Sequence, residues 1–107
     1  MAAPIPAEAG RSPIHGKGCF ASRAIAEGEL IGEYTGSPTQ QDGVHVLWVE
    51  DDDGTFFGID GDSVLRWLNH SSEPNVEFDG PRLYALRAIA IGEELTFHYG
   101  EEWAHVP

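Results

Sequence analysis

The sequence predicts a mainly β fold made of short sheets, with one or two short helices. Short apolar runs alternate with turn signals rich in Gly, Asp and Pro every eight to twelve residues, a spacing typical of β-rich domains. The chain has 107 residues, which corresponds to one domain of ordinary size. It contains no internal repeat and no apolar run of about 18 residues. We therefore expect a single domain over residues 12–107, preceded by a flexible arm over residues 1–11.

The first half of the chain predicts an arm, a strand and a hairpin. The arm (MAAPIPAEAGR) combines two prolines with small residues, and such chain ends are usually loosely held. The segment GELIGEYTG predicts a strand over about residues 30–35. The alternating pattern of residues 43–60, GVHVLWVEDDDGTFFGID, predicts a hairpin whose acidic turn is Asp51–Gly54.

The second half predicts a short helix, a second hairpin and a final strand. Asp62 or Ser63 is placed to cap the helix, because the apolar residues of VLRWL (64–68) are too closely spaced for one strand face. The segment NVEFDGPRLYAL (75–86) predicts a hairpin that turns at its Asp-Gly-Pro. The last strand is expected over residues 94–99.

The composition is strongly acidic, with 18 Asp plus Glu against 6 Lys plus Arg and a formal net charge of −12. This charge opposes binding to phosphate backbones, so we expect no direct binding to nucleic acid. It favours a basic protein or peptide as partner, although solubility or life in high salt would explain the same excess of acid. The first residues lack the basic and apolar regions of a secretory signal. An intracellular, by default cytoplasmic, protein without membrane contact is therefore expected.

Several common kinds of reactive site are not supported by the residue spacing. No Gly-rich loop ends in Lys-Ser or Lys-Thr, so no phosphate-binding loop is predicted. The five histidines form no pair at helical i, i+4 spacing, and one cysteine cannot build a Cys-rich cluster, so no metal is expected. Cys19 follows His15 and could act as a nucleophile, but its apolar setting, GCFA, favours a buried, inert thiol.

Three segments carry polar residues and glycines that a simple β domain does not require. In HGKGCFA (15–21), two glycines flank one residue and would let the backbone approach a ligand closely. In RWLNHSSEPNVEF (66–78), Asn-His-Ser follows an apolar Trp-Leu, which indicates internal hydrogen bonding. In GEELTFHYG (92–100), period two places Phe97 and Tyr99 on one face. Taken alone, an aromatic pair in a core strand explains this third segment more simply.

Together and in this order, these segments resemble the SET-domain protein-lysine methyltransferases. The resemblance runs from about Ser12 to Gly100 through HGKGCFASRAIAEGELIGEYTG, RWLNHSSEPN and ALRAIAIGEELTFHYG. It implies a fold of short β-sheets with a C-terminal pseudoknot, in which the final segment threads through a loop near Asn-His-Ser. It also implies a minimal member of the family, without Cys-rich flanking segments.

The resemblance implies S-adenosylmethionine as the methyl donor. By position, its methionine end would be held by the backbone of His15, Gly16, Lys17 and Gly18. Its amino-acid and adenine portions would contact Asn69 and His70. Tyr99 would also border the bound cofactor. Trp103 is placed to stack on adenine. An ordinary surface or core tryptophan is the alternative at that position.

The resemblance also implies roles for three aromatic residues. Tyr99 matches the catalytic tyrosine of the family, and Tyr34 matches a second tyrosine that lines the lysine channel. Phe97 completes this substrate-lysine pocket, and a phenylalanine there leaves room for di- or trimethylation. Methyl transfer needs a neutral amine and little water, and burial beside a sulfonium lowers the lysine pKa from about 10.4. By orienting the two reactants, the protein can lower the activation barrier of methyl transfer by on the order of 7–11 kcal/mol.

The sequence departs from the family pattern at several points. Ser72 replaces the usual cysteine after Asn-His-Ser, and His98 replaces the usual aspartate before the catalytic tyrosine. Period two points His98 away from Tyr99, as a tolerated substitution on the outer face that could alter the pH profile. A partner subunit could replace missing flanks, so a monomer and a homodimer are both expected states.

Two other classes of function compete with the enzyme. A catalytically weak SET-like module that binds a peptide or the cofactor would have lost turnover with its flanks. A small β-rich structural protein without a ligand is the second alternative. Retention of Tyr34, Asn69, His70 and Tyr99 favours an active lysine methyltransferase that acts on a basic protein or a histone-like tail.

Overall fold

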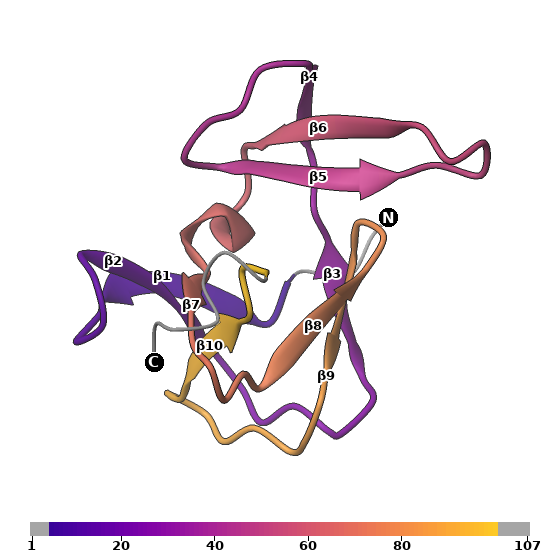
Figure 1. Cartoon of the computed structure of the whole chain (residues 1–107). Helices are drawn as coiled ribbons and strands as arrows, with labels where there is room; N and C mark the ends of the chain where they lie inside the picture. Colours follow the sequence, from indigo (N-terminus) through magenta and orange to yellow (C-terminus); the bar gives the residue numbers. More distant parts are fainter. Residues whose placement is uncertain (1–4, 101–107) are drawn as a thin grey trace.

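The computed structural model describes residues 5–100, which form three small sheets and one 3₁₀ helix (Figure 1). This confirms the expected mainly β fold of short sheets. Within residues 5–100, no helix is long and apolar enough to cross a membrane. The elements are β1 (Ala7–Arg11), β2 (Lys17–Ala21), β3 (Leu30–Glu33), β4 (Gly36–Thr39), β5 (Val46–Glu50), β6 (Phe56–Gly61), η1 (Val64–Trp67), β7 (Asn69–His70), β8 (Val76–Asp79), β9 (Arg82–Ala85) and β10 (Glu94–Phe97).

The first sheet has the strand order β1-β2-β10-β7, and its first strand corrects a prediction. Residues 7–11, expected to belong to a flexible arm, pair antiparallel with β2 along their whole length. Small residues have low intrinsic strand propensity, but pairing with a neighbouring strand overrides it. Gly10 supports this pairing, because a Cβ there would lie 3.1 Å from the Phe20 ring. The glycine therefore makes room for the aromatic ring of β2.

The other two sheets are built on the two predicted hairpins. The sheet β4-β6-β5 contains the first hairpin, whose turn is held by the Asp51 carboxylate accepting bonds from the Asp53 and Thr55 N–H groups. Gly54 in this turn adopts a φ of 80°, which glycine tolerates without strain. The sheet β3-β9-β8 contains the second hairpin. Both turns lie where the Asp-Gly signals predicted them.

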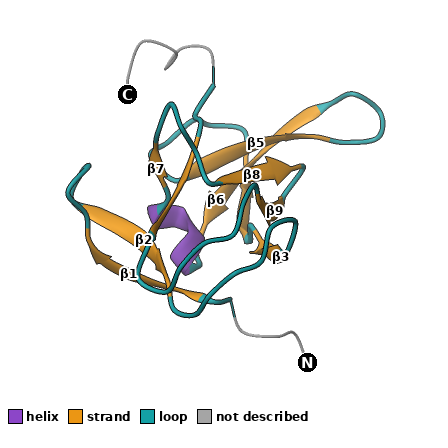
Figure 2. Ribbon diagram, turned by 90° about the horizontal axis from the view of Figure 1, so that it is seen from below, coloured by secondary structure: helices purple, strands orange, loops and turns teal. Residues whose placement is uncertain are grey.

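A single core joins the sheets to the helix. The side chains of Leu65, Leu83 and Leu95, from η1, β9 and β10, are at most 1% exposed, and burying one such side chain stabilises the fold by about 1.5–3 kcal/mol. The helix packs against β1 and β2, as Figure 2 shows. Ser63 caps it by accepting a bond from the Leu65 N–H, at 3.2 Å. The cap is one of the two residues that the sequence proposed.

Strand β10 lies between β2 and β7 and is bonded to the loop that follows β7. It runs antiparallel to β2 and parallel to β7. The Phe97 and Thr96 carbonyls accept bonds from the N–H groups of Ser71 and Asn75, at 3.1 Å each, and the Thr96 N–H donates to the Asn75 amide oxygen at 2.8 Å. The last described strand is thus held along its length by residues far away in sequence, as the expected pseudoknot requires.

Candidate active site

The glycine-containing loop between β1 and β2 is held by Ser12. The Ser12 N–H donates to the Gly16 carbonyl at 2.8 Å, and its hydroxyl accepts from the Ile14 and His15 N–H groups at 3.0 and 3.4 Å. Gly16 has a φ of 39°, in the left-handed region that favours glycine. These bonds fix a tight turn whose backbone faces the start of β7.

Asn69 ties this loop to the two strands beside it. Its side-chain amide donates to the His15 and Lys17 carbonyls at 3.3 and 3.1 Å and to the Glu94 carboxylate at 2.9 Å. Glu94 also accepts a bond from the Ser12 hydroxyl, at 2.8 and 2.9 Å to its two oxygens. A Cβ at Gly18 would lie 2.9 Å from that of Ser12. The structure thus brings the predicted cofactor residues of the loop together with Asn69.

Tyr99 is fixed at both its backbone and its hydroxyl. Its hydroxyl donates to the Leu68 carbonyl at 2.8 Å, and its N–H donates to His70 Nδ1 at 3.0 Å. Burial, followed by the negative charge of Glu94, raises the pKa of the Tyr99 phenol. The phenol therefore stays protonated near neutral pH and acts as a neutral hydrogen-bonding group.

Tyr34 and Phe97 are connected through Phe78. The Tyr34 and Phe78 ring centroids are 5.7 Å apart, those of Phe78 and Phe97 are 5.1 Å apart, and those of Phe97 and Tyr99 are 4.9 Å apart. Tyr34 is only 6% exposed, and its hydroxyl donates to the His45 carbonyl. Burial, with a smaller contribution from Asp60, raises the Tyr34 pKa to about 12. Tyr34 is thus a neutral phenol anchored in the core.

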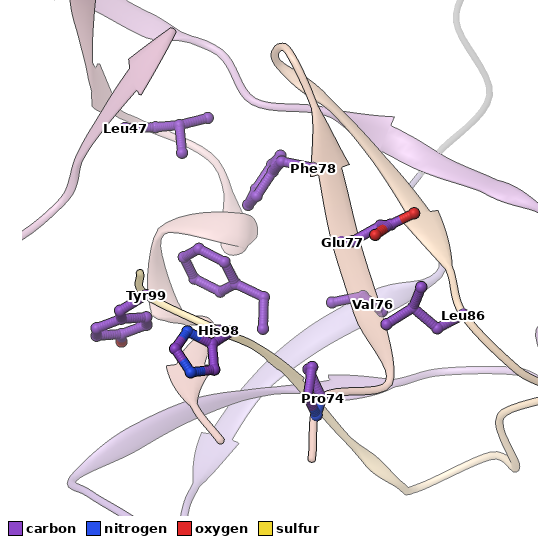
Figure 3. A pocket seen from close by; sticks show the side chains of 9 residues that line it. Leu47, Pro74, Val76, Glu77, Phe78, Leu86, His98 and Tyr99 are labelled. Atoms are coloured by element: carbon purple, nitrogen blue, oxygen red, sulfur yellow. The ribbon is translucent and has the colours of Figure 1, made fainter. Parts of the chain in front are cut away.

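A cavity of about 380 Å³ opens beside Tyr99 (Figure 3). Its walls include Phe97 and Tyr99 together with Phe78 of β8 and Leu47 of β5. Phe97 and Tyr99 thus share one surface, as the period-two pattern predicted. Tyr34 lines a different hollow, of about 400 Å³, between β3 and the β4-β6 strands. The structure therefore brings two of the three predicted substrate-pocket residues into one cavity and links the third to them through Phe78.

His98 differs from the outward orientation that the sequence pattern predicted. Strand β10 ends at Phe97, so the alternation of faces stops there, and His98 lines the same cavity as Tyr99. Its ring packs on that of His70, with centroids 4.7 Å apart and planes at 78°. The predicted direction, away from Tyr99, was wrong because it extended the strand by two residues, whereas the side chain is exposed as expected.

The remaining candidate residues have separate surroundings. Lys17 Nζ lies 4.8 Å from the centroid of the Trp67 ring, a cation–π distance. Cys19 is fully buried, and burial together with Glu94 raises its thiol pKa to about 12. The thiolate needed for nucleophilic attack is therefore scarce near neutral pH. Between residues 5 and 100, no three His, Cys, Asp or Glu side chains are grouped as metal ligands would be. Trp103 lies outside the described residues.

Three residues of the site were not singled out from the sequence. Glu94 and Ser12 join Asn69 in holding the loop, and Phe78 connects the two tyrosines. A weak signal for Glu94 was present, because a charged residue opens the mainly apolar strand Glu94–Phe97 and a charge that is even partly buried requires partners. The sequence contains no comparable signal for Ser12.

Comparisons with known proteins match most of the chain. The family model described as SET domain matches residues 16–100, which contain Asn69, Phe97 and Tyr99 and nearly all of the loop. This chain belongs to the SET-domain family. The match covers most of each of the three sequence segments that carried the resemblance, and it ends at the glycine after Tyr99.

Two curated relatives and one solved structure illustrate how this SET domain compares. It is 32% identical to histone-lysine N-methyltransferase 2B of Homo sapiens, over 83% of this chain and 4% of that protein. It is 30% identical to the H3 lysine-4 specific histone-lysine N-methyltransferase of Chaetomium globosum, over 88% of this chain and 11% of that protein. The Chaetomium thermophilum polycomb repressive complex 2, in an autoinhibited conformation bound to S-adenosylmethionine, superposes with a TM-score of 0.78 at 25% identity, covering 92% of this chain and 16% of that one. The chain thus spans a small part of the length of these relatives.

Proposed function

We propose that this SET domain is an S-adenosylmethionine-dependent protein-lysine N-methyltransferase. The observation that carries the proposal is the position of Tyr99, whose hydroxyl is anchored on the Leu68 carbonyl next to Asn69, the residue that holds the glycine loop. One neutral hydroxyl, a largely apolar cavity and the hydrogen-bonded glycine loop thus lie around the parallel strands β7 and β10. The names of the curated relatives, which are histone-lysine N-methyltransferases, support the same activity.

The residues present fit the cofactor. S-adenosylmethionine supplies an electrophilic methyl group on a positively charged sulfonium. The backbone of residues 15–18 would hold its methionine end, and Lys17, the single lysine of the chain, places its Nζ over the Trp67 ring beside this loop. The Glu94 carboxylate, bonded to Asn69 beside this loop, would supply a negative charge that favours a bound sulfonium. Asn69 uses its amide N–H groups on the loop and on Glu94, so we assign it the task of holding the loop in shape.

Tyr99 would orient the lysine amine. Its hydroxyl donates its proton to the Leu68 carbonyl, and a phenol oxygen that donates its proton is also able to accept an N–H of the amine. The raised pKa keeps this oxygen from becoming a phenolate that would compete as a nucleophile. The Phe97 ring, which has no hydroxyl to hold a water molecule, leaves room for a second or third methyl group. Tyr34, bonded to the His45 carbonyl, would support the wall of this channel through Phe78.

The acceptor is a basic lysine-containing protein or a histone-like tail. The net charge of −12 attracts such a segment. Leu47 and Phe78 line the cavity from β5 and β8, and each of these strands lies at the edge of its sheet. An extended peptide can add to a strand edge of this kind and place its side chains in alternate pockets. The full chain acts as a monomer or a homodimer, which light scattering after size-exclusion chromatography distinguishes.

The Tyr99→Phe variant tests the proposal. The full chain is incubated with recombinant histone H3 and radiolabelled S-adenosylmethionine, and binding of the cofactor is measured separately by calorimetry. We expect Tyr99→Phe to lower methyl transfer by about 100-fold, a usual cost of losing one positioned hydrogen-bonding group, and to leave the cofactor Kd within about threefold. Tyr84→Phe, on β9, is the matched control and should retain transfer.

Two results would contradict the proposal. Equal transfer by the unaltered protein and Tyr99→Phe would remove Tyr99 from the reaction. Cofactor binding without transfer to histone H3 or to any other basic protein would favour a SET-like module that binds a peptide or the cofactor without turnover.

A further inference from the structure

Two imidazoles hold the backbone on both sides of Tyr99. The His70 Nδ1 accepts a bond from the N–H of Tyr99, and the His98 Nδ1 accepts one from the N–H of Gly100, each at 3.0 Å. The two rings are in direct contact, with centroids 4.7 Å apart. The peptide groups before and after the Tyr99 side chain therefore depend on neighbouring histidines.

These contacts determine where the proton of each ring lies. A backbone N–H can only donate, so each Nδ1 must carry a lone pair, and each ring is neutral with its proton on Nε2. His45 provides the opposite case, because its Nδ1 faces the Arg66 carbonyl at 3.1 Å. That contact needs a proton on Nδ1, so protonation of His45 preserves its bond, whereas protonation of His98 destroys the bond to Gly100.

The surroundings of His98 decide what protonation does. The His70 ring is in contact with the His98 ring and is only 5% exposed. Two positive charges on these adjacent rings would repel each other, so protonation of both is unfavourable. Glu77 of β8 lines the same cavity, but no ion pair joins it to His98 in the part of the chain that the structure covers. Tyr99 is the other titratable group in the cavity, and its phenol stays neutral. Protonation of His98 thus removes a backbone bond without forming an ion pair in its place.

We propose that His98 is a positioning residue for Tyr99: its neutral imidazole, packed on His70, holds the chain after the tyrosine, and protonation releases it. The catalytic consequence rests on the proposed methyltransferase function. Imidazole titrates near neutral pH, so the site loosens under mildly acidic conditions. An asparagine or aspartate at position 98 would make the same bond to Gly100 through a side-chain oxygen, as in an Asx turn. Either residue would hold the turn without an imidazole that titrates near neutrality.

The decisive experiment needs neither cofactor nor substrate. The full chain, labelled with nitrogen-15, is titrated from about pH 8 to pH 5.5 by NMR. At the upper pH, His98 should carry its proton on Nε2, and the Gly100 amide signal should then shift with the same midpoint as the His98 ring. In His98→Asn the Gly100 signal should not follow this titration, and in the control His45→Asn it should follow it as in the unaltered protein. A proton on Nδ1 of His98 at pH 8, or a Gly100 signal indifferent to His98, would overturn the proposal.

Turnover gives a second, separate readout with histone H3 as acceptor. The ratio of kcat of His98→Asn to that of the unaltered protein should rise about three- to tenfold between pH 8 and pH 6, as expected for one lost hydrogen bond. His98→Phe should lower kcat at both pH values, with little change in KM, because Tyr99 acts on the reacting amine. A ratio independent of pH would contradict the positioning role. Absence of any turnover in the unaltered protein would refute the proposed function, while the NMR titration would still decide the role of His98.

Discussion

Replacing Asn69 with alanine should remove the side-chain hydrogen bonds that hold the glycine loop between β1 and β2 against the rest of the site. The side chain is only 7% exposed, and its amide makes three contacts, to the His15 and Lys17 carbonyls and to the Glu94 carboxylate. Alanine removes all three and leaves Glu94 with Ser12 as its remaining side-chain partner among the described residues. The loop between β1 and β2 then loses its side-chain bonds to β7, and Ser12 is left to hold it on Glu94 of β10.

The expected loss of stability follows from these contacts. The amide has two N–H groups, so its three contacts amount to roughly two full hydrogen bonds. One bond to a neutral carbonyl contributes about 1 kcal/mol and one to a carboxylate about 2 kcal/mol. Glu94 is partly exposed, so water replaces part of the second bond. We therefore expect Asn69→Ala to lower the free energy of unfolding by about 2–3 kcal/mol, which corresponds to a fall in Tm of about 10–20 °C for a domain of this size.

Urea denaturation and calorimetry with S-adenosylmethionine measure the two consequences separately. Asn75→Ala is the matched control, because Asn75 is 3% exposed and bonds to the Glu94 carbonyl and the Thr96 N–H at 2.8 Å each, away from the loop. Both variants should lose comparable stability. Below both melting temperatures, only Asn69→Ala should bind the cofactor at least about tenfold more weakly, since binding must then order the loop. Unchanged stability of Asn69→Ala, or equal weakening in both variants, would refute the reasoning.

Three further predictions concern the aromatic residues. Phe97→Tyr places a hydroxyl in the cavity and should shift the product on histone H3 lysines toward monomethyl, read by mass spectrometry; monomethyl product alone from both proteins would contradict this. Gly61→Ala should cost about 1–3 kcal/mol in urea denaturation, because an added Cβ would lie 2.6 Å from Cζ of Tyr34, and an unchanged midpoint would exclude this clash. The folded-state pKa of Tyr34, about 12, exceeds the unfolded value of about 10. This group therefore contributes stability that is complete below pH 10 and is lost as pH rises through 12. As pH rises between these values, the free energy of unfolding of Tyr34→Phe should fall by up to about 2–3 kcal/mol less than that of the unaltered protein. Equal falls in the two proteins would show that burial of Tyr34 is not the cause.

Local turn and cap chemistry was predictable. Asp51–Gly54 and the Asp-Gly-Pro after Phe78 combine residues that favour tight turns, and both hairpins formed there. Ser63 could be proposed as a cap because a hydroxyl before an apolar cluster satisfies a free helix N–H. These features depend on a few neighbouring residues, so short sequence patterns are enough to predict them.

Features that depend on distant pairing were not predictable in this way. Residues 7–11 form a strand because β2 offers them a partner. The two-residue strand Asn69–His70 has no periodic pattern, and only its parallel pairing with β10 defines it. The same pairing places Glu94 beside Asn69 and ends β10 before His98, which turns that side chain into the cavity. The candidate site residues were found through the family resemblance, whereas the contacts that hold them required the structure.

The most direct test of the account is mass spectrometry of recombinant histone H3 after incubation with the full chain and S-adenosylmethionine. The account predicts methylated lysine, including di- or trimethyl product, which requires the cofactor and is almost lost with Tyr99→Phe. Histone H3 and other basic proteins that stay unmodified, although the protein is folded and binds the cofactor, would contradict it.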